Sequence, residues 1–171
     1  AKGLIVPAVE TPEQVRLLVK YAKFPPVGHR GYAPTRDGYW NPGELTAEGI
    51  TDYMETKNRE TLLLPQCETL SCLEHLGEIV SIDGVDGVYI GPLDLSIAMG
   101  IPLKMEDSRM QNAIGHILQT CKKYGKFSAI YCSDTLSAKR YAAMGFDSVT
   151  IGLDLSCLTA TYRSIAVEMH H

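Results

Sequence analysis

The sequence has no long apolar run, no concentration of basic residues and no closely spaced cysteine pair. A membrane-spanning helix needs about 18 or more consecutive apolar residues, and the sequence contains no such run. The first residues lack the charged segment and cleavage site of a secretory signal peptide. Lysines and arginines are scattered along a chain of net charge −4, so the basic surface that nucleic-acid binding requires is missing. These absences predict a cytoplasmic protein that binds neither nucleic acid nor a membrane.

Several motifs of known chemistry are absent as well. The sequence has no G-x-S-x-G motif and no dinucleotide-binding fingerprint at a strand-to-helix turn. No lysine stands at the end of a predicted strand, so a Schiff-base aldolase would lack its nucleophile. The five cysteines form no zinc-type cluster with histidine, and we expect most of them to be small buried residues. The terminal pair His170-His171 is consistent with the start of a purification tag.

The sequence does contain a regular alternation of short apolar runs with longer helical segments. In the first helical segment, Thr11 is a suitable cap, Pro12 suits the first helical position, and Val15 and Val19 recur at helical spacing. Strands that are apolar on both faces, each followed by a helix, predict a parallel sheet covered by helices. An open doubly wound sheet and a (β/α)8 barrel both fit this α/β pattern. The predicted strands are 4–9, 61–68, 87–92, 127–133 and 148–154, and a helix before the fourth carries an apolar face of Met110, Ile114, Ile117, Leu118 and Cys121.

One long interruption, residues 25–49, separates the first helix from the second strand. It is rich in proline, glycine and aromatic residues, and it is too long for a simple connection. Loops of this kind commonly carry function. We therefore expect Arg30 and Tyr32, which Gly28 and Gly31 frame, to lie near the mouth of a site.

Two carboxylates stand where a parallel sheet places its chemistry, at the carboxyl ends of strands. Glu68 closes the second predicted strand, and Asp94 follows the third. Two oxygen donors completed by water suit Mg²⁺ or Mn²⁺. The alternative is that Asp94 caps a helix beginning at Leu95 and that Glu68 caps or solvates its own helix. Gln66 shares a face of its strand with Glu68, so it could hydrogen-bond whatever the metal holds.

Four segments together resemble the HpcH/HpaI aldolase family. They are LIVPAVETPEQV, KFPPVGHRGYA, the strand end QCET, and GVDGVYIGPLDLSIAMG, and the resemblance runs from Leu4 to about Leu158. Members of this family are class II, divalent-metal-dependent pyruvate aldolases, with relatives that act on 4-hydroxy-2-oxoheptanedioate and 2-keto-3-deoxy sugar acids. The resemblance implies a TIM (β/α)8 barrel.

The resemblance also implies roles for individual residues. Glu68 and Asp94 would hold Mg or Mn, with Co as a further option, while Gln66, Asp94 and the backbone around Leu93 would contact a 2-oxo acid. The implied reaction cleaves a 4-hydroxy-2-oxo acid to pyruvate and an aldehyde through a metal-stabilised enolate. The last helix, residues 154–168, would pack on a neighbouring subunit, so we expect a homo-oligomer.

The sequence departs from the family pattern at several positions. Leu93 stands where the family usually has alanine, and Ala33 and Ala129 stand where it has glycine, so the implied pocket is smaller. Pro65 lies inside a predicted central strand, where it removes a hydrogen-bond donor.

Residues 1–171 supply only about five of the eight βα units of a barrel. We therefore expect them to form a single partial barrel domain. In the family, the catalytic histidine, its acidic partner and a substrate-binding arginine lie in earlier units, so no general base is assigned here. We expect the chain to be part of a longer protein. The alternatives are a non-catalytic barrel fragment or subunit that keeps the metal site, and another metal-enolate lyase of the superfamily, such as one acting on an acyl-CoA thioester.

Overall fold

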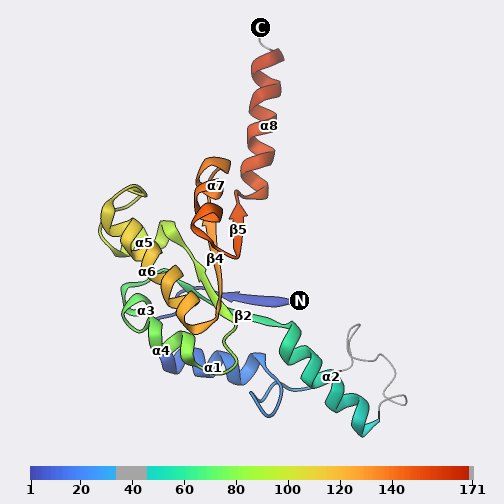
Figure 1. Ribbon diagram of the computed structural model, residues 1–171. Coiled ribbons are helices and arrows are strands. Elements are labelled where there is room, and N and C mark those ends of the chain that lie inside the picture. The colour runs from blue at the N-terminus through green and yellow to red at the C-terminus, as the bar shows by residue number, and fades with distance from the viewer. Residues whose placement is uncertain (34–45, 170–171) are drawn as a thin grey trace. The chain divides into compact units, whose positions relative to one another are not determined.

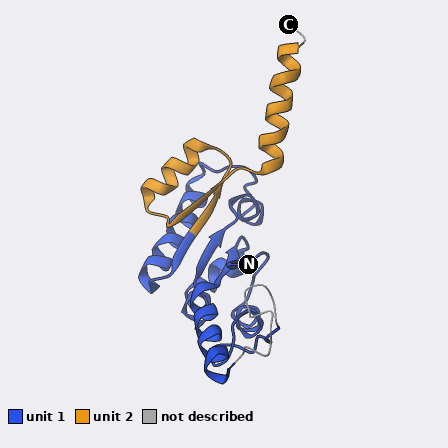
Figure 2. Ribbon diagram, turned by 90° about the vertical axis from the view of Figure 1, so that its right-hand side faces the viewer, with its two compact units in different colours: residues 1–128 blue, residues 129–171 orange. Residues whose placement is uncertain are grey.

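The computed structural model describes residues 1–33 and 46–169, which form two compact units that are treated separately (Figure 2). The first unit contains residues 1–128 and the second residues 129–171. Most of the long loop, residues 34–45, and the terminal pair His170-His171 lie outside the described residues.

The first unit is built on three parallel strands, β1 (Gly3–Val6), β2 (Leu62–Cys67) and β3 (Gly87–Ile90) (Figure 1). β1 pairs with β2 from Gly3↔Leu62 to Val6↔Pro65, so Pro65 does lie inside a paired strand. β2 pairs with β3 through Gln66↔Tyr89 and Cys67↔Ile90. The carboxyl ends of β2 and β3 are therefore neighbours, as the parallel pattern predicts.

Helices follow the strands in the order expected from the sequence. The first begins with a capping box, in which Thr11 accepts from the Gln14 N–H and Gln14 reaches back to the cap. The predicted apolar face of the longest helix is confirmed, because all five of its residues are at most 2 % exposed. The helices of this unit are α1 (Pro12–Ala22), α2 (Ala47–Glu60), α3 (Leu70–Glu74), α4 (Leu76–Ser81), α5 (Pro92–Ala98) and α6 (Ser108–Tyr124).

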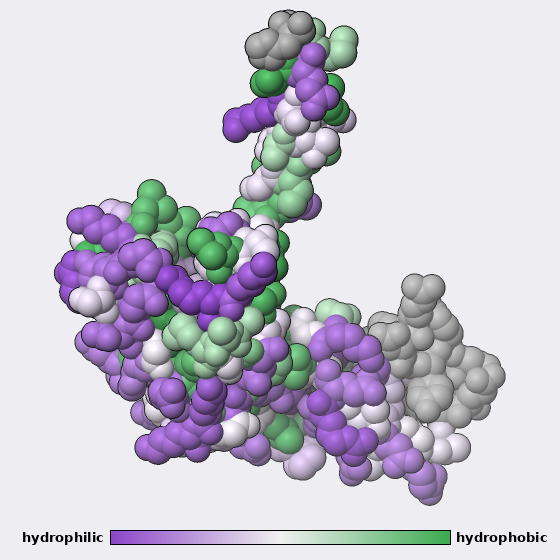
Figure 3. All heavy atoms as spheres, turned by 45° about the horizontal axis from the view of Figure 1, so that its top comes forward, coloured by the Kyte–Doolittle hydropathy of each residue, from purple (hydrophilic) through white to green (hydrophobic). Residues whose placement is uncertain are grey.

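The second unit repeats the strand–helix pattern. β4 (Phe127–Cys132) begins at the end of the first unit and pairs in parallel with β5 (Ser148–Ile151), and α7 (Thr135–Met144) connects them. The last helix, α8 (Asp154–Met169), has no buried residue, and Figure 3 shows apolar surface along it. Across residues 1–33 and 46–169, no helix combines the length and the apolar character that crossing a membrane requires.

Candidate metal-binding site

The first predicted ligand, Glu68, lies just beyond the carboxyl end of β2. Its side chain is buried, with the residue only 8 % exposed. Thr69, not Glu68, is the cap of α3, because the Thr69 side chain accepts from the Cys72 N–H at 3.0 Å. The alternative in which Glu68 caps or solvates its own helix is therefore wrong.

Both carboxylate oxygens of Glu68 are oriented by neighbours. The Ala8 N–H donates to Oε1 over 2.7 Å from the loop that follows β1. The side-chain amide of Gln66 donates to Oε2. This second contact confirms that Gln66 and Glu68 share one face of the chain, as strand alternation predicts.

Gly91 makes room for this pair at the end of β3. A Cβ atom at this position would lie 2.5 Å from Gln66 Nε2 and 2.5 Å from Glu68 Oε2, closer than real side chains approach. A glycine is therefore needed for a carboxylate and an amide to share this corner with the β3 backbone. Because Gly91 has no side chain, no Cβ atom stands beside Oε2 at the start of α5.

The second predicted ligand, Asp94, is the third residue of α5 and is exposed. The helix begins at Pro92 with Gly91 as its cap, so the alternative in which Asp94 caps a helix beginning at Leu95 is wrong. Within residues 1–33 and 46–169, no hydrogen bond or ion pair is recorded for the Asp94 carboxylate. Its oxygens are thus available to a ligand.

Leu93 occupies the second position of the same helix and is 44 % exposed. Its carbonyl accepts from the buried Ser96 hydroxyl at 2.6 Å, which secures the first turn. The N–H groups of Leu93 and Asp94 lie in that first turn, where backbone donors have no partner inside the helix.

The donor set fits a hard divalent cation. Cys67 is fully buried, and its hydrogen bond with Cys72, together with burial, raises the pKa of the Cys67 thiol well above its usual range. It therefore stays protonated and offers no thiolate. Among the described residues no group of three or more His, Cys, Asp or Glu side chains converges. Two carboxylates completed by water or substrate oxygens are what Mg²⁺ and Mn²⁺ accept.

The structure places Arg30 away from this site. Its guanidinium stacks 4.6 Å from the Phe24 ring. Arg30 also lies beside Thr61, with which it lines a cavity. Thr61 directly precedes β2 whereas Glu68 directly follows it, and the six residues of that strand span about 20 Å. The prediction that Arg30 lies near the site mouth is therefore wrong. Tyr32, the other residue of that prediction, packs edge-on against Tyr53 of α2, with ring centroids 5.9 Å apart. Arg30 instead helps to line a cavity of about 140 Å³ with Ala1, Leu4, Tyr21, Ala22 and Thr61.

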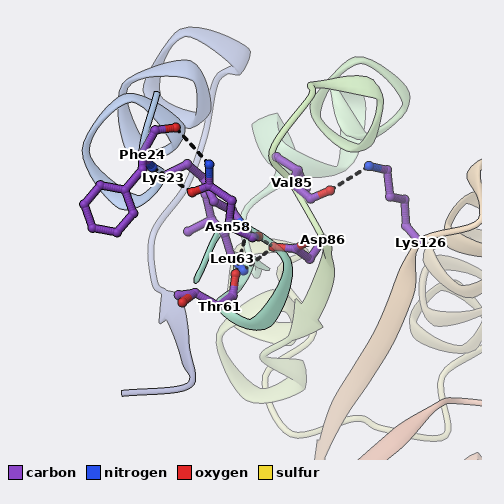
Figure 4. Close-up of polar contacts among 8 residues, drawn as sticks. All are labelled: Lys23, Phe24, Asn58, Thr61, Leu63, Val85, Asp86 and Lys126. Carbon is purple, nitrogen blue, oxygen red and sulfur yellow. Dashed lines mark hydrogen bonds and ion pairs between the residues drawn. The ribbon is translucent and has the colours of Figure 1, made fainter. Parts of the chain in front are cut away.

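A second polar cluster, which the sequence did not predict, lies at the amino ends of β2 and β3 (Figure 4). The Lys23 side chain is only 2 % exposed, and its ammonium donates to the Asn58 carbonyl at 2.9 Å, the Thr61 carbonyl at 2.5 Å and Asp86 Oδ2 at 2.7 Å. The same Asp86 oxygen accepts from the Leu63 N–H at 2.7 Å.

Two further contacts extend the Lys23 cluster. The Asn58 side chain bonds both backbone groups of Phe24, accepting at 2.7 Å and donating at 3.0 Å. The Lys126 ammonium donates to the Val85 carbonyl at 2.6 Å. Figure 4 shows the contacts of Lys23 and Asn58 tying the ends of α1 and α2 to the starts of β2 and β3.

Comparisons with known proteins identify the family to which the chain is related. The sequence profile of the family described as HpcH/HpaI aldolase/citrate lyase matches residues 1–160. A hydroxypyruvate/pyruvate aldolase of Deinococcus radiodurans is 38% identical over 96% of this chain and 58% of its own length. A 4-hydroxy-2-oxo-heptane-1,7-dioate aldolase of Klebsiella pneumoniae is 35% identical over 100% of this chain and 63% of its own length.

The structural comparison gives the same fold. The crystal structure of an HpcH/HpaI aldolase from Desulfitobacterium hafniense superimposes with a TM-score of 0.87, covering 99% of this chain and 63% of that one at 24% sequence identity. The chain thus spans about three fifths of the length of these relatives.

Proposed function

Because the chain belongs to the HpcH/HpaI aldolase/citrate lyase family, we propose that it carries the metal site of an aldolase that cleaves a 4-hydroxy-2-oxo acid to pyruvate and an aldehyde. The observation that carries this proposal is the corner formed by Glu68, Gln66 and Gly91, next to the exposed Asp94. The names of the relatives support the same chemistry. In this proposal the parallel βα units belong to a (β/α)8 barrel.

The proposed ligands are Glu68 and Asp94, with Mg²⁺ or Mn²⁺ as the ion. When bound, the ion supplies Lewis-acid stabilisation of negative charge that develops on a substrate oxygen. Glu68 offers the oxygen beside Gly91, while the Ala8 N–H holds the other oxygen.

The remaining residues of the corner would orient the 2-oxo acid. The first-turn N–H groups of Leu93 and Asp94 can donate to its carboxylate, since they have no partner inside the helix. Gln66 can donate to a substrate oxygen next to Glu68. The Leu93 side chain, larger than the family's alanine, narrows the rim on the exposed side.

The proposal is tested on the complete protein, which we expect to carry the earlier βα units, by following exchange of solvent deuterium into the methyl group of pyruvate by NMR. Exchange should require added Mg²⁺ or Mn²⁺ and should fall at least about 100-fold in Asp94→Asn, which keeps the side-chain shape but removes one ligand charge. Asp83→Asn, at an exposed aspartate of the same unit, is the matched control and should exchange like the wild type. Unchanged exchange in Asp94→Asn, or full exchange in excess chelator, would refute the proposal.

The non-catalytic alternative gives a different result in the same experiment. A subunit that only keeps the metal site would bind Mn²⁺, with affinity lost in Asp94→Asn, but would show no exchange above the buffer rate. That outcome would replace the aldolase proposal by the binding alternative.

We also propose a cytoplasmic homo-oligomer. The support is α8, where every side chain is exposed and Leu155, Leu158 and Ile165 are at least 50 % exposed. Burying such residues against a second copy would remove a large apolar surface from water. Monomeric sedimentation at micromolar concentration would contradict this assembly.

A further inference from the structure

The loop between β1 and α1 contains a backbone conformation that its residue type disfavours. Ala8 has φ 54°, in the left-handed region that residues with a Cβ rarely adopt. For an L-residue this region costs about 1–2 kcal/mol relative to right-handed backbone. In this conformation the Ala8 N–H donates to Glu68 Oε1 at 2.7 Å.

The same loop is fastened to the residues that follow Glu68. The Thr69 hydroxyl donates to the Val9 carbonyl at 3.0 Å, and the Ser71 hydroxyl donates to the Glu10 carbonyl at 2.9 Å. Val9 is 3 % exposed, so the loop is also held by packing. With the Ala8 contact, three hydrogen bonds connect the segment 8–10 to the segment 68–71, which lies about 60 residues away in sequence.

We propose that Ala8 is a positioning residue for Glu68, acting through its backbone N–H on the metal-binding carboxylate. This inference rests on the proposed function. A donor fixed on Oε1 restricts rotation of the carboxylate and keeps Oε2 on the side of Gly91. Hydrogen bonds to charged acceptors are the stronger ones. Loss of an outer partner of a ligand costs about 10–100-fold in metal affinity.

The N–H can be removed without changing the side chain by an ester substitution, in which lactic acid replaces Ala8. The matched control places the same ester at Ala47, the first residue of α2, which is exposed and whose N–H lies in the first helical turn. Mn²⁺ affinity of the purified protein is measured from the EPR signal of free Mn²⁺, which does not depend on turnover. Thermal melting without metal is recorded in parallel.

The expected result is a Mn²⁺ dissociation constant raised at least about tenfold by the ester at Ala8, and unchanged within about twofold by the ester at Ala47. Ala8→Gly keeps the N–H and adopts positive φ freely, so its Mn²⁺ affinity should equal the wild type. Wild-type affinity in the ester at Ala8, even with a lowered melting temperature, would overturn the inference. So would an equal loss in Ala8→Gly.

If the ester variant at Ala8 does not fold, the Mn²⁺ affinity of Ser71→Ala is measured instead. This substitution removes the hydrogen bond from Ser71 to the Glu10 carbonyl, which fastens the same loop. A Mn²⁺ affinity weakened beyond the variation seen in the Ala47 control supports the inference, and unchanged affinity overturns it. Failure of the proposed function is recognised separately: the wild type would not bind Mn²⁺, or Glu68→Gln would bind it as tightly as the wild type.

Discussion

The Lys23 cluster and the Glu68 corner lie at opposite ends of the same two strands, and they differ in how fully their polar groups are paired. Lys23 has three donors and three acceptors around it. Glu68, by contrast, has one donor on each oxygen, although an ionised carboxylate has room for about four. Asp94 has no hydrogen bond or ion pair recorded within the described part of the chain.

The difference follows from what each end does. A buried ammonium is tolerated only when its charge and its donors are compensated, so the Lys23 cluster is complete within the protein. A site for a cation has to keep lone pairs unused, and it therefore remains incomplete until the cation binds. Pairing at the amino ends serves the fold, whereas under the proposed function the spare acceptors at the carboxyl ends are kept for a cation.

The largest effect is expected from breaking the Lys23 cluster. Asp86→Ala leaves a buried ammonium without its counter-charge and the Leu63 N–H without its acceptor. The free energy of unfolding should fall by about 3–5 kcal/mol. Urea unfolding measures it, with Asp83→Ala, an exposed aspartate of the same loop, expected within about 0.5 kcal/mol of the wild type. Equal effects of the two variants would show that the ion pair is unimportant.

The next effect should come from completing the Glu68 corner. Mn²⁺ at 100 times its dissociation constant should raise the free energy of unfolding by about 2.7 kcal/mol, because it binds only the folded state. Asp94→Asn should abolish this gain and leave the metal-free stability unchanged within about 0.5 kcal/mol. Asp83→Asn is the control that should keep the gain. Stabilisation of Asp94→Asn by Mn²⁺ equal to that of the wild type would remove Asp94 from the ligand set.

The sequence allowed the Glu68 corner to be anticipated better than the Lys23 cluster. Strand alternation and parallel pairing place Gln66 and Glu68 next to the end of β3, and both depend on local pattern. A lysine after a helix ordinarily points to solvent, and nothing local indicates otherwise. The acceptors that bury Lys23 are 35, 38 and 63 residues away in sequence, so only the folded chain brings them together.

Two helix features were missed for related reasons. Helix α2 was not assigned, because it has no buried residue and thus no strong apolar periodicity to detect. The alternative reading of Asp94 placed the start of α5 at Leu95, because the actual cap, Gly91, has no side chain to signal a helix start. The five strands were located correctly from their apolar runs, although β1 and β5 contain no buried residue. The apolar face of α6 was predicted correctly because it rests on helical periodicity.

A smaller effect is expected from adding a single carbon atom to the Glu68 corner. Gly91→Ala would place its Cβ 2.5 Å from Glu68 Oε2, so the carboxylate has to shift. Stability should fall by about 1–3 kcal/mol, as in other overpacked sites, and Mn²⁺ affinity should fall with it. Gly115→Ala, in the middle of α6 with nothing within 4 Å of the new atom, should instead gain about 0.5–1 kcal/mol. Wild-type metal affinity in Gly91→Ala would mean that the corner tolerates displacement of the carboxylate.

The smallest effect should come from the edge of the Lys23 cluster. Lys126→Met removes the donor to the Val85 carbonyl, a contact of 2.6 Å, but it leaves no buried charge behind. Water can replace the ammonium because Lys126 is only half-buried, so urea unfolding should show a loss of about 1 kcal/mol. Lys139→Met, at an exposed lysine of α7, is the control and should change stability by less than about 0.5 kcal/mol. A loss in Lys126→Met as large as that in Asp86→Ala would show that the cost lies in the number of hydrogen bonds, and not in an uncompensated buried charge.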